Sequence, residues 1–218
     1  MNCLTLVRNH LPGRLVAAAY MFAVMSLASG QQPRFPQLKL EDTSGEQRAM
    51  AERMLKETRV GLGGPWNIML RSPGMAEGMI GLYNHFRWNS ALPTRLVELA
   101  IMMTARQWPA PYEWYIHYPL AVKAGVAPEV LADVRAGRRP SAAKPDEVAL
   151  YEFAIELLTK HTVSDAAFEK AKASLGEKGV VDLTALVGTY AAIGGLLNVA
   201  GVAGPPGTGP EYLPRKLP

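Results

Sequence analysis

The sequence predicts an all-α fold of about seven helices in one domain. Apolar residues recur at helical spacing along most of the chain, no stretch shows the strict alternation typical of strands, and prolines or glycines separate the periodic segments. Hydrophobic residues make up 49% of the 218 residues and charged residues 19%. This composition favours a substantial core and argues against a disordered chain.

The first thirty residues have the layout of a secretory signal. Arg8 and Arg14 precede an apolar run over residues 15–28, and small residues at 28–30 follow it. The run is shorter than the roughly 20 residues of an ordinary transmembrane helix, which favours a cleaved signal peptide. An uncleaved N-terminal anchor is the alternative interpretation. We expect a periplasmic or secreted protein. The sequence divides into a signal peptide over 1–30, a helical domain over 31–204 and a Pro-rich tail over 205–218.

Charge and cysteine content exclude several classes of function. The net charge is +4, and Arg8 and Arg14 lie in the leader, so 21 basic and 19 acidic residues leave +2 for the remainder. Such a small excess is not typical of a nucleic-acid-binding protein. Cys3 is the only cysteine and would leave with the leader. We therefore expect no disulfide, thiolate metal site or cysteine nucleophile in the mature protein. We also expect no stable membrane insertion once the leader is removed.

The first helices of the domain are predicted from their periodicity and their breaks. A glycine-rich segment ending in a proline, residues 61–65, interrupts the first helical pattern. Ser72 and Pro73 form a cap and first-turn pair for the second helix. The third is apolar nearly all round, which is typical of a buried helix. The expected helices cover residues 41–61, 73–92 and 94–108.

The second half of the domain follows the same logic. Pro111 and Pro128 precede two helical patterns, Ser164 caps a third, and Gly176 separates the last two. The tail holds five prolines after residue 204, so it cannot be regular and is expected to wrap a neighbouring surface or stay mobile. The expected helices cover residues 112–126, 128–134, 148–158, 165–173 and 181–202.

Three ionisable residues stand within apolar helical patterns. Glu98 lies in the segment 96–103, which has no clearly exposed face, and a buried charge is costly without a partner. Arg95, three residues earlier, is a structural ion-pair partner for it. Glu113 and His117 are spaced i,i+4, which places a carboxylate beside an imidazole. Since a carboxylate fixes the tautomer of a histidine and raises its basicity, the trio is a candidate proton-transfer site.

Each feature also has a structural explanation. Glu98 could serve only an ion pair, and Glu113 with His117 could cap a helix surface. The neighbouring aromatic residues could line an apolar pocket around the trio, or could serve packing or a subunit interface. These aromatic residues are Trp108, Tyr112, Trp114, Tyr115 and Tyr118.

The spacing of the trio resembles a known signature. Glu98 is followed after nineteen residues by His117, with Glu113 four before the histidine, as in the carboxymuconolactone decarboxylase and alkylhydroperoxidase D superfamily. The resemblance extends over about residues 82–202. In the peroxidase branch a redox cysteine pair stands seven and four residues before the histidine, where this chain has Ala110 and Glu113. The cysteine-less decarboxylase branch, with a glutamate at the second position, is the closer match.

The resemblance implies an all-α subunit of this superfamily that assembles as a homo-oligomer, either a trimer or a hexamer, with active sites near subunit contacts. It also implies a lyase that acts on a small lactone or keto carboxylic acid without a cofactor or a metal. No nucleic-acid partner is expected.

The chemistry of such a lyase suggests roles for these residues. Decarboxylation of an unsaturated lactone acid leaves a dienolate that must be protonated at carbon, and the substrate is its own electron sink. We hypothesise that His117 delivers the proton, that Glu113 orients it, and that Glu98, with a pKa raised by burial, is the second acid or base. Arg95 would hold a substrate carboxylate or merely neutralise Glu98. The expected substrate-binding residues are Arg95, Tyr112 and Trp114.

Three other functions remain open at this point. The protein could be a noncatalytic oligomeric protein of the same fold that binds a hydrophobic acid. It could be a metal hydrolase with Glu98, Glu113 and His117 as ligands, although only one of them is a histidine. Peroxidase-type activity is the least favoured, because the mature protein would hold no cysteine.

Overall fold

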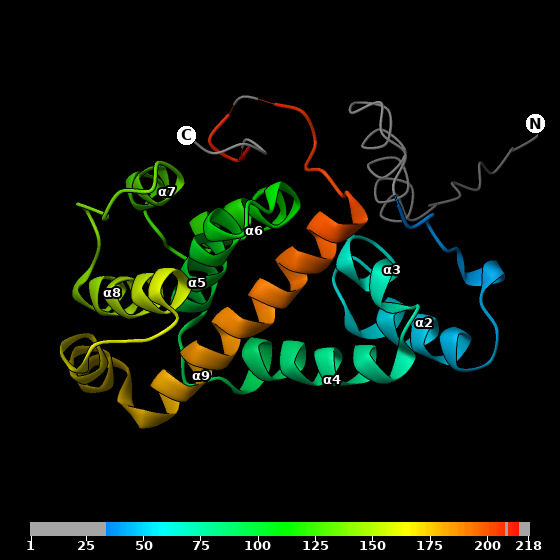
Figure 1. Ribbon diagram of the computed structural model, residues 1–218, viewed down its shortest axis with the longest axis horizontal. Helices are drawn as coiled ribbons and strands as arrows, with labels where there is room; N and C mark the ends of the chain where they lie inside the picture. The colour runs from blue at the N-terminus through cyan, green and yellow to red at the C-terminus, as the bar shows by residue number, and fades with distance from the viewer. Residues whose placement is uncertain (1–33, 208, 214–218) are drawn as a thin grey trace, which may run out of the picture.

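The computed structural model describes residues 34–207 and 209–213, and every regular element among them is helical (Figure 1). The all-α prediction is therefore confirmed, with eight α-helices in the described residues in place of about seven. The predicted signal peptide, residues 1–30, and its boundary with the domain lie outside the described residues. In chain order the elements are η1 (Leu40–Asp42), α2 (Gly45–Glu57), α3 (Pro65–Met69), α4 (Pro73–Asn84), η2 (His85–Asn89), α5 (Thr94–Gln107), α6 (Pro111–Lys123), α7 (Pro128–Arg135), α8 (Pro145–Lys160) and α9 (Asp165–Ala200).

The helices form two groups with α9 between them. In Figure 1, α9 runs obliquely across the centre of the molecule, with α5 to α8 on one side and α2 to α4 on the other. Helix α5 is the centre of the larger group and packs against α6, α7, α8 and α9. Helices α2 and α3 pack against α4, and α3 also reaches α9. Helix α3 therefore joins the smaller group to α9 at the seam between the two groups.

Helix α5 is buried on all sides, as its sequence predicts. Every residue from Leu96 to Ala105 is buried, including the charged Glu98, which is 1% exposed. Burying a leucine or isoleucine side chain stabilises a fold by about 1.5–3 kcal/mol, so the apolar residues of α5 contribute strongly to the core. The carboxylate of Glu98 is thus held at a fixed position inside the protein.

Helix α9 contains the predicted break. Ser164 caps its N-terminus by accepting a hydrogen bond from the backbone N–H of Ala167 at 3.4 Å. Gly176 interrupts the helical path with φ 72° and ψ 171°, a conformation that is essentially restricted to glycine. The other predicted cap is wrong in its detail: Ser72 makes no side-chain cap bond, and its backbone carbonyl accepts from Ala76.

The predicted single helix over residues 73–92 is interrupted. Helix α4 ends at Asn84, and a π-helical turn, η2, follows. Asp182 of α9 holds the chain there, because it accepts hydrogen bonds from the backbone N–H of Ala91 at 2.7 Å and from His85 Nε2 at 2.9 Å. A π-helical turn holds more residues than an α-helical one and so redirects the side chains within it. Arg87 lies in this turn.

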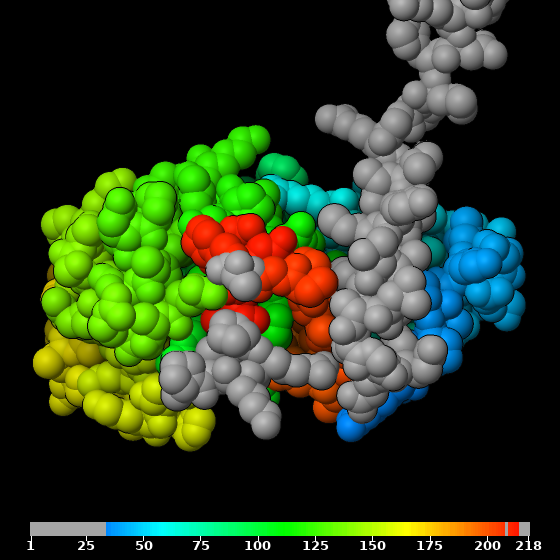
Figure 2. Space-filling view, turned by 90° about the horizontal axis from the view of Figure 1, so that it is seen from above, coloured from blue at the N-terminus to red at the C-terminus, as the bar shows by residue number. Residues whose placement is uncertain are grey.

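The described part of the Pro-rich tail lies across α6 and the end of α9 (Figure 2). Trp114 Nε1 donates a hydrogen bond to the carbonyl oxygen of Pro210 at 3.0 Å, and Arg135 Nε donates to that of Tyr212 at 2.8 Å. The ring of Tyr212 packs on Tyr115 at a centroid distance of 5.5 Å. The described part of the tail therefore packs on a neighbouring surface, which was one of the two expectations.

Helix α9 is long and apolar enough to cross a membrane by length and composition alone. However, 56% of its most apolar 18-residue window is buried inside the protein. It also bends at Gly176 and packs against α3, α5 and α8. These contacts are those of a core helix.

Candidate functional site

The centre of the site is an imidazole held between two carboxylates. His117 of α6 donates a hydrogen bond from Nδ1 to Glu98 Oε2 of α5 at 2.7 Å. Its other nitrogen, Nε2, lies 3.4 Å from Glu113 Oε2, one helical turn earlier on α6. The three residues are 5% exposed or less. The structure thus brings the predicted trio together in one buried cluster.

A fourth charged residue, Arg87 of η2, completes the cluster. Its guanidinium donates a hydrogen bond to Glu98 Oε1 at 2.6 Å, and its side chain is only 6% exposed. It also lies over the ring of Tyr83, 5.5 Å from the centroid, which is a cation–π contact. Arg87 was not predicted from the sequence, because the π-helical turn that carries it leaves no periodic signal.

Arg95 does not have the predicted role at Glu98. Its guanidinium binds Glu147 and Asp146 at the start of α8, the latter at 2.5 Å. Both acidic residues lie in the first turn of α8, so Arg95 joins α5 to α8. The expectation that Arg95 neutralises Glu98 is therefore wrong, because Arg87 forms the ion pair with Glu98 instead.

The electrostatic environment favours the protonated form of His117 and the ionised form of Glu98. Burial opposes a charged imidazole, but the contacts with Glu113 and Glu98 outweigh it and raise the pKa of His117 above its usual 6.5. Burial also opposes a charged carboxylate, but His117 and Arg87 outweigh it and lower the pKa of Glu98 below its usual 4.5. The hypothesis of a Glu98 pKa raised by burial is therefore wrong, because it omitted the two partners.

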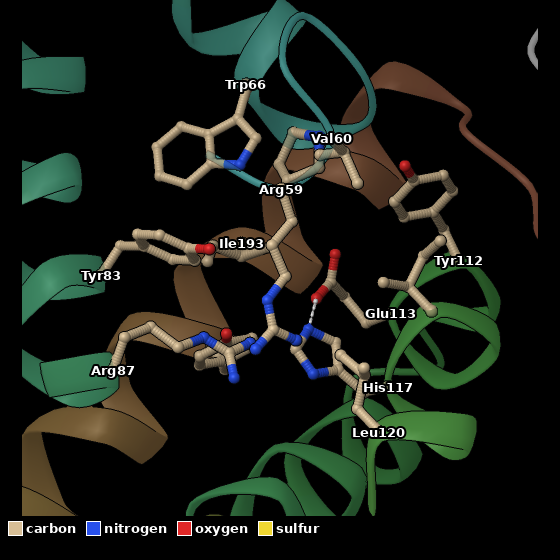
Figure 3. A pocket seen from close by; sticks show the side chains of 13 residues that line it. Arg59, Val60, Trp66, Tyr83, Arg87, Tyr112, Glu113, His117, Leu120 and Ile193 are labelled. Atoms are coloured by element: carbon tan, nitrogen blue, oxygen red, sulfur yellow. Dashed lines mark ion pairs between the residues drawn. The ribbon is translucent and has the colours of Figure 1, made fainter. Parts of the chain in front are cut away.

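The cluster opens onto a small cavity in the seam between the two helix groups (Figure 3). The cavity has a volume of about 50 Å³, and both His117 and Glu113 line it, as does Arg87. One carboxylate oxygen of Glu113 faces His117, and the other points away from the imidazole (Figure 3). A space of this size holds a few water molecules or the reacting end of a small molecule.

The aromatic residues expected around the site have different positions. Tyr112 lines the cavity, whereas Trp114 is fully buried and binds the tail through Pro210. Tyr115 and Tyr118 line a separate, open groove on the outer side of α6. The cavity receives its other aromatic walls from α3, α4 and α9, which sequence spacing could not relate to His117. These walls are Trp66, Tyr83 and Tyr190.

Two phenols near the imidazole stay neutral. Burial raises the pKa of Tyr190 and that of Tyr112 well above the usual 10. The ring of Tyr190 meets the imidazole of His117 edge to face, with 5.4 Å between centroids. Tyr190 therefore limits the rotation of His117 and supplies an apolar wall.

The described residues contain no group of three or more His, Cys, Asp or Glu side chains arranged to hold a metal ion. The trio does converge, but its carboxylates are turned toward the imidazole and Arg87 rather than toward a common point.

Comparisons with known structures agree with this fold. The chain resembles the crystal structure of an alkylhydroperoxidase AhpD core, an uncharacterised peroxidase-related protein from Ralstonia eutropha. The TM-score is 0.66 and the identity 16%, over 79% of this chain and 92% of the other. A protein of unknown function from Agrobacterium tumefaciens, described as a candidate antioxidant defence protein AhpD, gives a TM-score of 0.58 at 16% identity. The match covers 66% of this chain and 100% of the other.

The sequence itself is matched more narrowly. No curated protein sequence matches the chain. Residues 73–156 match the model of the carboxymuconolactone decarboxylase family, and this range includes Glu98, Glu113 and His117. The segment that carries the site, residues 73–156, is therefore similar to the carboxymuconolactone decarboxylase family, and the fold as a whole is similar to that of an AhpD core.

Proposed function

We propose that the protein is an acid–base enzyme that needs no cofactor and transfers a proton to or from a small lactone or keto carboxylic acid, as a decarboxylase-like lyase does. The observation that carries this proposal is the buried imidazole of His117, bound through Nδ1 to one carboxylate while Nε2 lies beside a second at the cavity. The family match over residues 73–156 supports it.

The geometry reassigns the two carboxylates. Glu98 makes the shorter contact, 2.7 Å to Nδ1, so Glu98 is the residue that fixes the tautomer and the orientation of His117. Glu113 lines the cavity, so it is placed to exchange protons with a bound substrate or with His117 Nε2. Arg87 keeps Glu98 ionised by donating to its other oxygen.

Proton transfer in a decarboxylation would proceed in two balanced steps. The bond between the substrate carbon and its carboxylate breaks, carbon dioxide leaves, and the electron pair is delocalised over a dienolate. His117, protonated at Nε2, then gives its proton to the carbon and becomes neutral. Glu113 or water returns a proton to Nε2 for the next turnover. Because its contacts with the two carboxylates raise the pKa of His117, they favour the acid form that this step needs.

The other functions considered have less support. A dithiol peroxidase needs two thiols, and the 218-residue sequence has one cysteine, Cys3. A noncatalytic binding protein would gain nothing from a polarised imidazole at the wall of the cavity, although it would use the same apolar walls. Export through the leader and assembly as a homo-oligomer stay part of the proposal, on the leader pattern and on the family resemblance.

The test is a turnover screen of lactone and keto carboxylic acids, run with His117→Gln beside the unchanged protein. If His117 is the proton donor, the substitution should lower turnover by about 100-fold or more. His161→Gln is the matched control, because His161 is exposed at the end of α8. Equal turnover in the His117 variant would overturn the proposed role.

A further inference from the structure

A second arginine, Arg59, stands at the solvent end of the cavity. It belongs to the turn between α2 and α3 and lines the same cavity as His117, but it is exposed whereas His117 is buried. In Figure 3 its side chain runs from the turn into the cavity, with the guanidinium directed toward His117 and Arg87. A ligand bound in the cavity would therefore lie within reach of this guanidinium.

Among the described residues, Arg59 differs from the other arginines because it has no partner there. Within residues 34–207 and 209–213, each of the other ten arginines donates a hydrogen bond to a carboxylate or carbonyl oxygen. In the same part of the chain, Arg59 forms no hydrogen bond, ion pair or cation–π contact. Five N–H donors thus stand at the cavity without an acceptor in the part of the chain that the structure describes.

The charges around the cavity leave one positive charge without a counterion. Glu98 and Glu113 supply two negative charges, and Arg87 and a protonated His117 supply two positive ones. These four groups balance. Arg59 adds one more positive charge, so the site as a whole matches a ligand with a single negative charge.

The turn that carries Arg59 is held in place by its own contacts. Thr58 Oγ1 donates to the carbonyl oxygen of Met54 at 2.8 Å, and the backbone N–H of Gly63 donates to that of Val60 at 2.8 Å. Gly64, with φ 54°, lies so close to the ring of Tyr112 that a Cβ there would be 2.5 Å from it. The backbone at Arg59 is therefore fixed against α6, while its long side chain can adjust to a ligand.

We propose that Arg59 is the anion anchor of this site: it binds the carboxylate of a small organic acid at the open end of the cavity and holds the rest of the acid against His117. The planar guanidinium can form two parallel hydrogen bonds to a carboxylate, which gives orientation as well as affinity. This inference rests on the proposed function for the identity of the reacting group. It assigns a residue outside the matched segment 73–156.

The test measures binding rather than turnover. Crotonate, a small unsaturated monocarboxylate, and crotonamide, its neutral counterpart, are titrated into the full chain, and tryptophan fluorescence is followed because Trp66 lines the cavity. Arg59→Gln should weaken crotonate binding by about 10-fold or more, and Arg59→Lys by less, while crotonamide binding stays the same. Arg138→Gln, which removes an exposed arginine paired with Asp133, should change neither.

The outcomes separate this inference from the proposed function. Equal crotonate affinity in Arg59→Gln, or no crotonate binding by the unchanged protein at millimolar concentration, would overturn the anchor even if turnover depends on His117. Conversely, if His117→Gln keeps full turnover but crotonate binding still depends on Arg59, the anchor stands and the acid–base proposal fails. Because Arg59 is exposed, thermal unfolding of the variant should match that of the unchanged protein.

Discussion

Replacing Glu98 by glutamine tests the charge cluster directly, because the change keeps the size of the side chain and removes only its charge. Glu98 now accepts from Arg87 at 2.6 Å and from His117 at 2.7 Å. A glutamine has one acceptor oxygen, so its amide group must face one of these two donors. The simplest rearrangement keeps Arg87 on the oxygen and makes His117 release its Nδ1 proton, so that the imidazole accepts from the amide.

The expected magnitude follows from the burial of the cluster. Removing one partner of a buried ion pair costs about 3–5 kcal/mol, and neutralisation of His117 relieves part of this, so we expect a loss of about 3 kcal/mol in the free energy of unfolding. With an m-value of about 1–3 kcal/mol/M, the urea midpoint falls by about 1–3 M. The pKa of His117 should fall from above 6.5 to below it.

Two measurements check this prediction. Urea unfolding at pH 7 gives the change in stability, and an NMR titration of the imidazole nitrogens gives the pKa of His117. Glu169→Gln, at an exposed position of α9, is the control and should change neither quantity. A loss under about 0.5 kcal/mol, or a His117 pKa that stays above 6.5, would refute the view that Glu98 is the anion that keeps His117 protonated.

Three further outcomes follow from other contacts. Burial opposes the charge of Asp182, but its hydrogen bonds outweigh burial and lower its pKa to about 2 from the usual 3.8. Asp182→Asn should therefore lower the free energy of unfolding by about 2 kcal/mol above pH 4. Urea unfolding should show this difference vanishing as the pH falls toward about 2. Gly176→Ala should cost about 1–3 kcal/mol in the same assay, because its φ and ψ suit only glycine; no loss would mean that the break relaxes. Arg95→Gln should lower the free energy of unfolding by about 3 kcal/mol, because the buried Glu147, 1% exposed, loses its partner. The same change should leave crotonate affinity unchanged. Weaker crotonate binding would restore Arg95 as a substrate-binding residue.

The stability of the unchanged protein should also depend on pH through His117 and Glu98. A raised pKa for His117 means that its contribution to stability is fully present below pH 6.5 and is lost as the pH rises through the higher pKa of the folded state. A lowered pKa for Glu98 means the opposite: its contribution is present above pH 4.5 and is lost as the pH falls through the lower pKa of the folded state. In Glu98→Gln both changes should be absent from the stability profile.

Local sequence patterns predicted the helices because their signals are local. Periodicity identified α5, α6 and α8, prolines marked the starts of α6 and α7, and Gly176 marked the break in α9. The pair Glu113 and His117 was also predictable, because one helical turn joins the two residues. Where the prediction failed, as at η2, the cause is a contact with a distant residue: Asp182 holds the chain after α4.

The sequence by itself determined the helical elements and which charged side chains lie inside them, because spacing along a helix sets both. Only the tertiary structure decided which charges meet. It paired Glu98 with Arg87 and sent Arg95 to α8, since the direction of each side chain depends on the helix packed against it. It also placed Arg59 on the same cavity as His117, although 58 residues separate them, because the turn before α3 packs against α6.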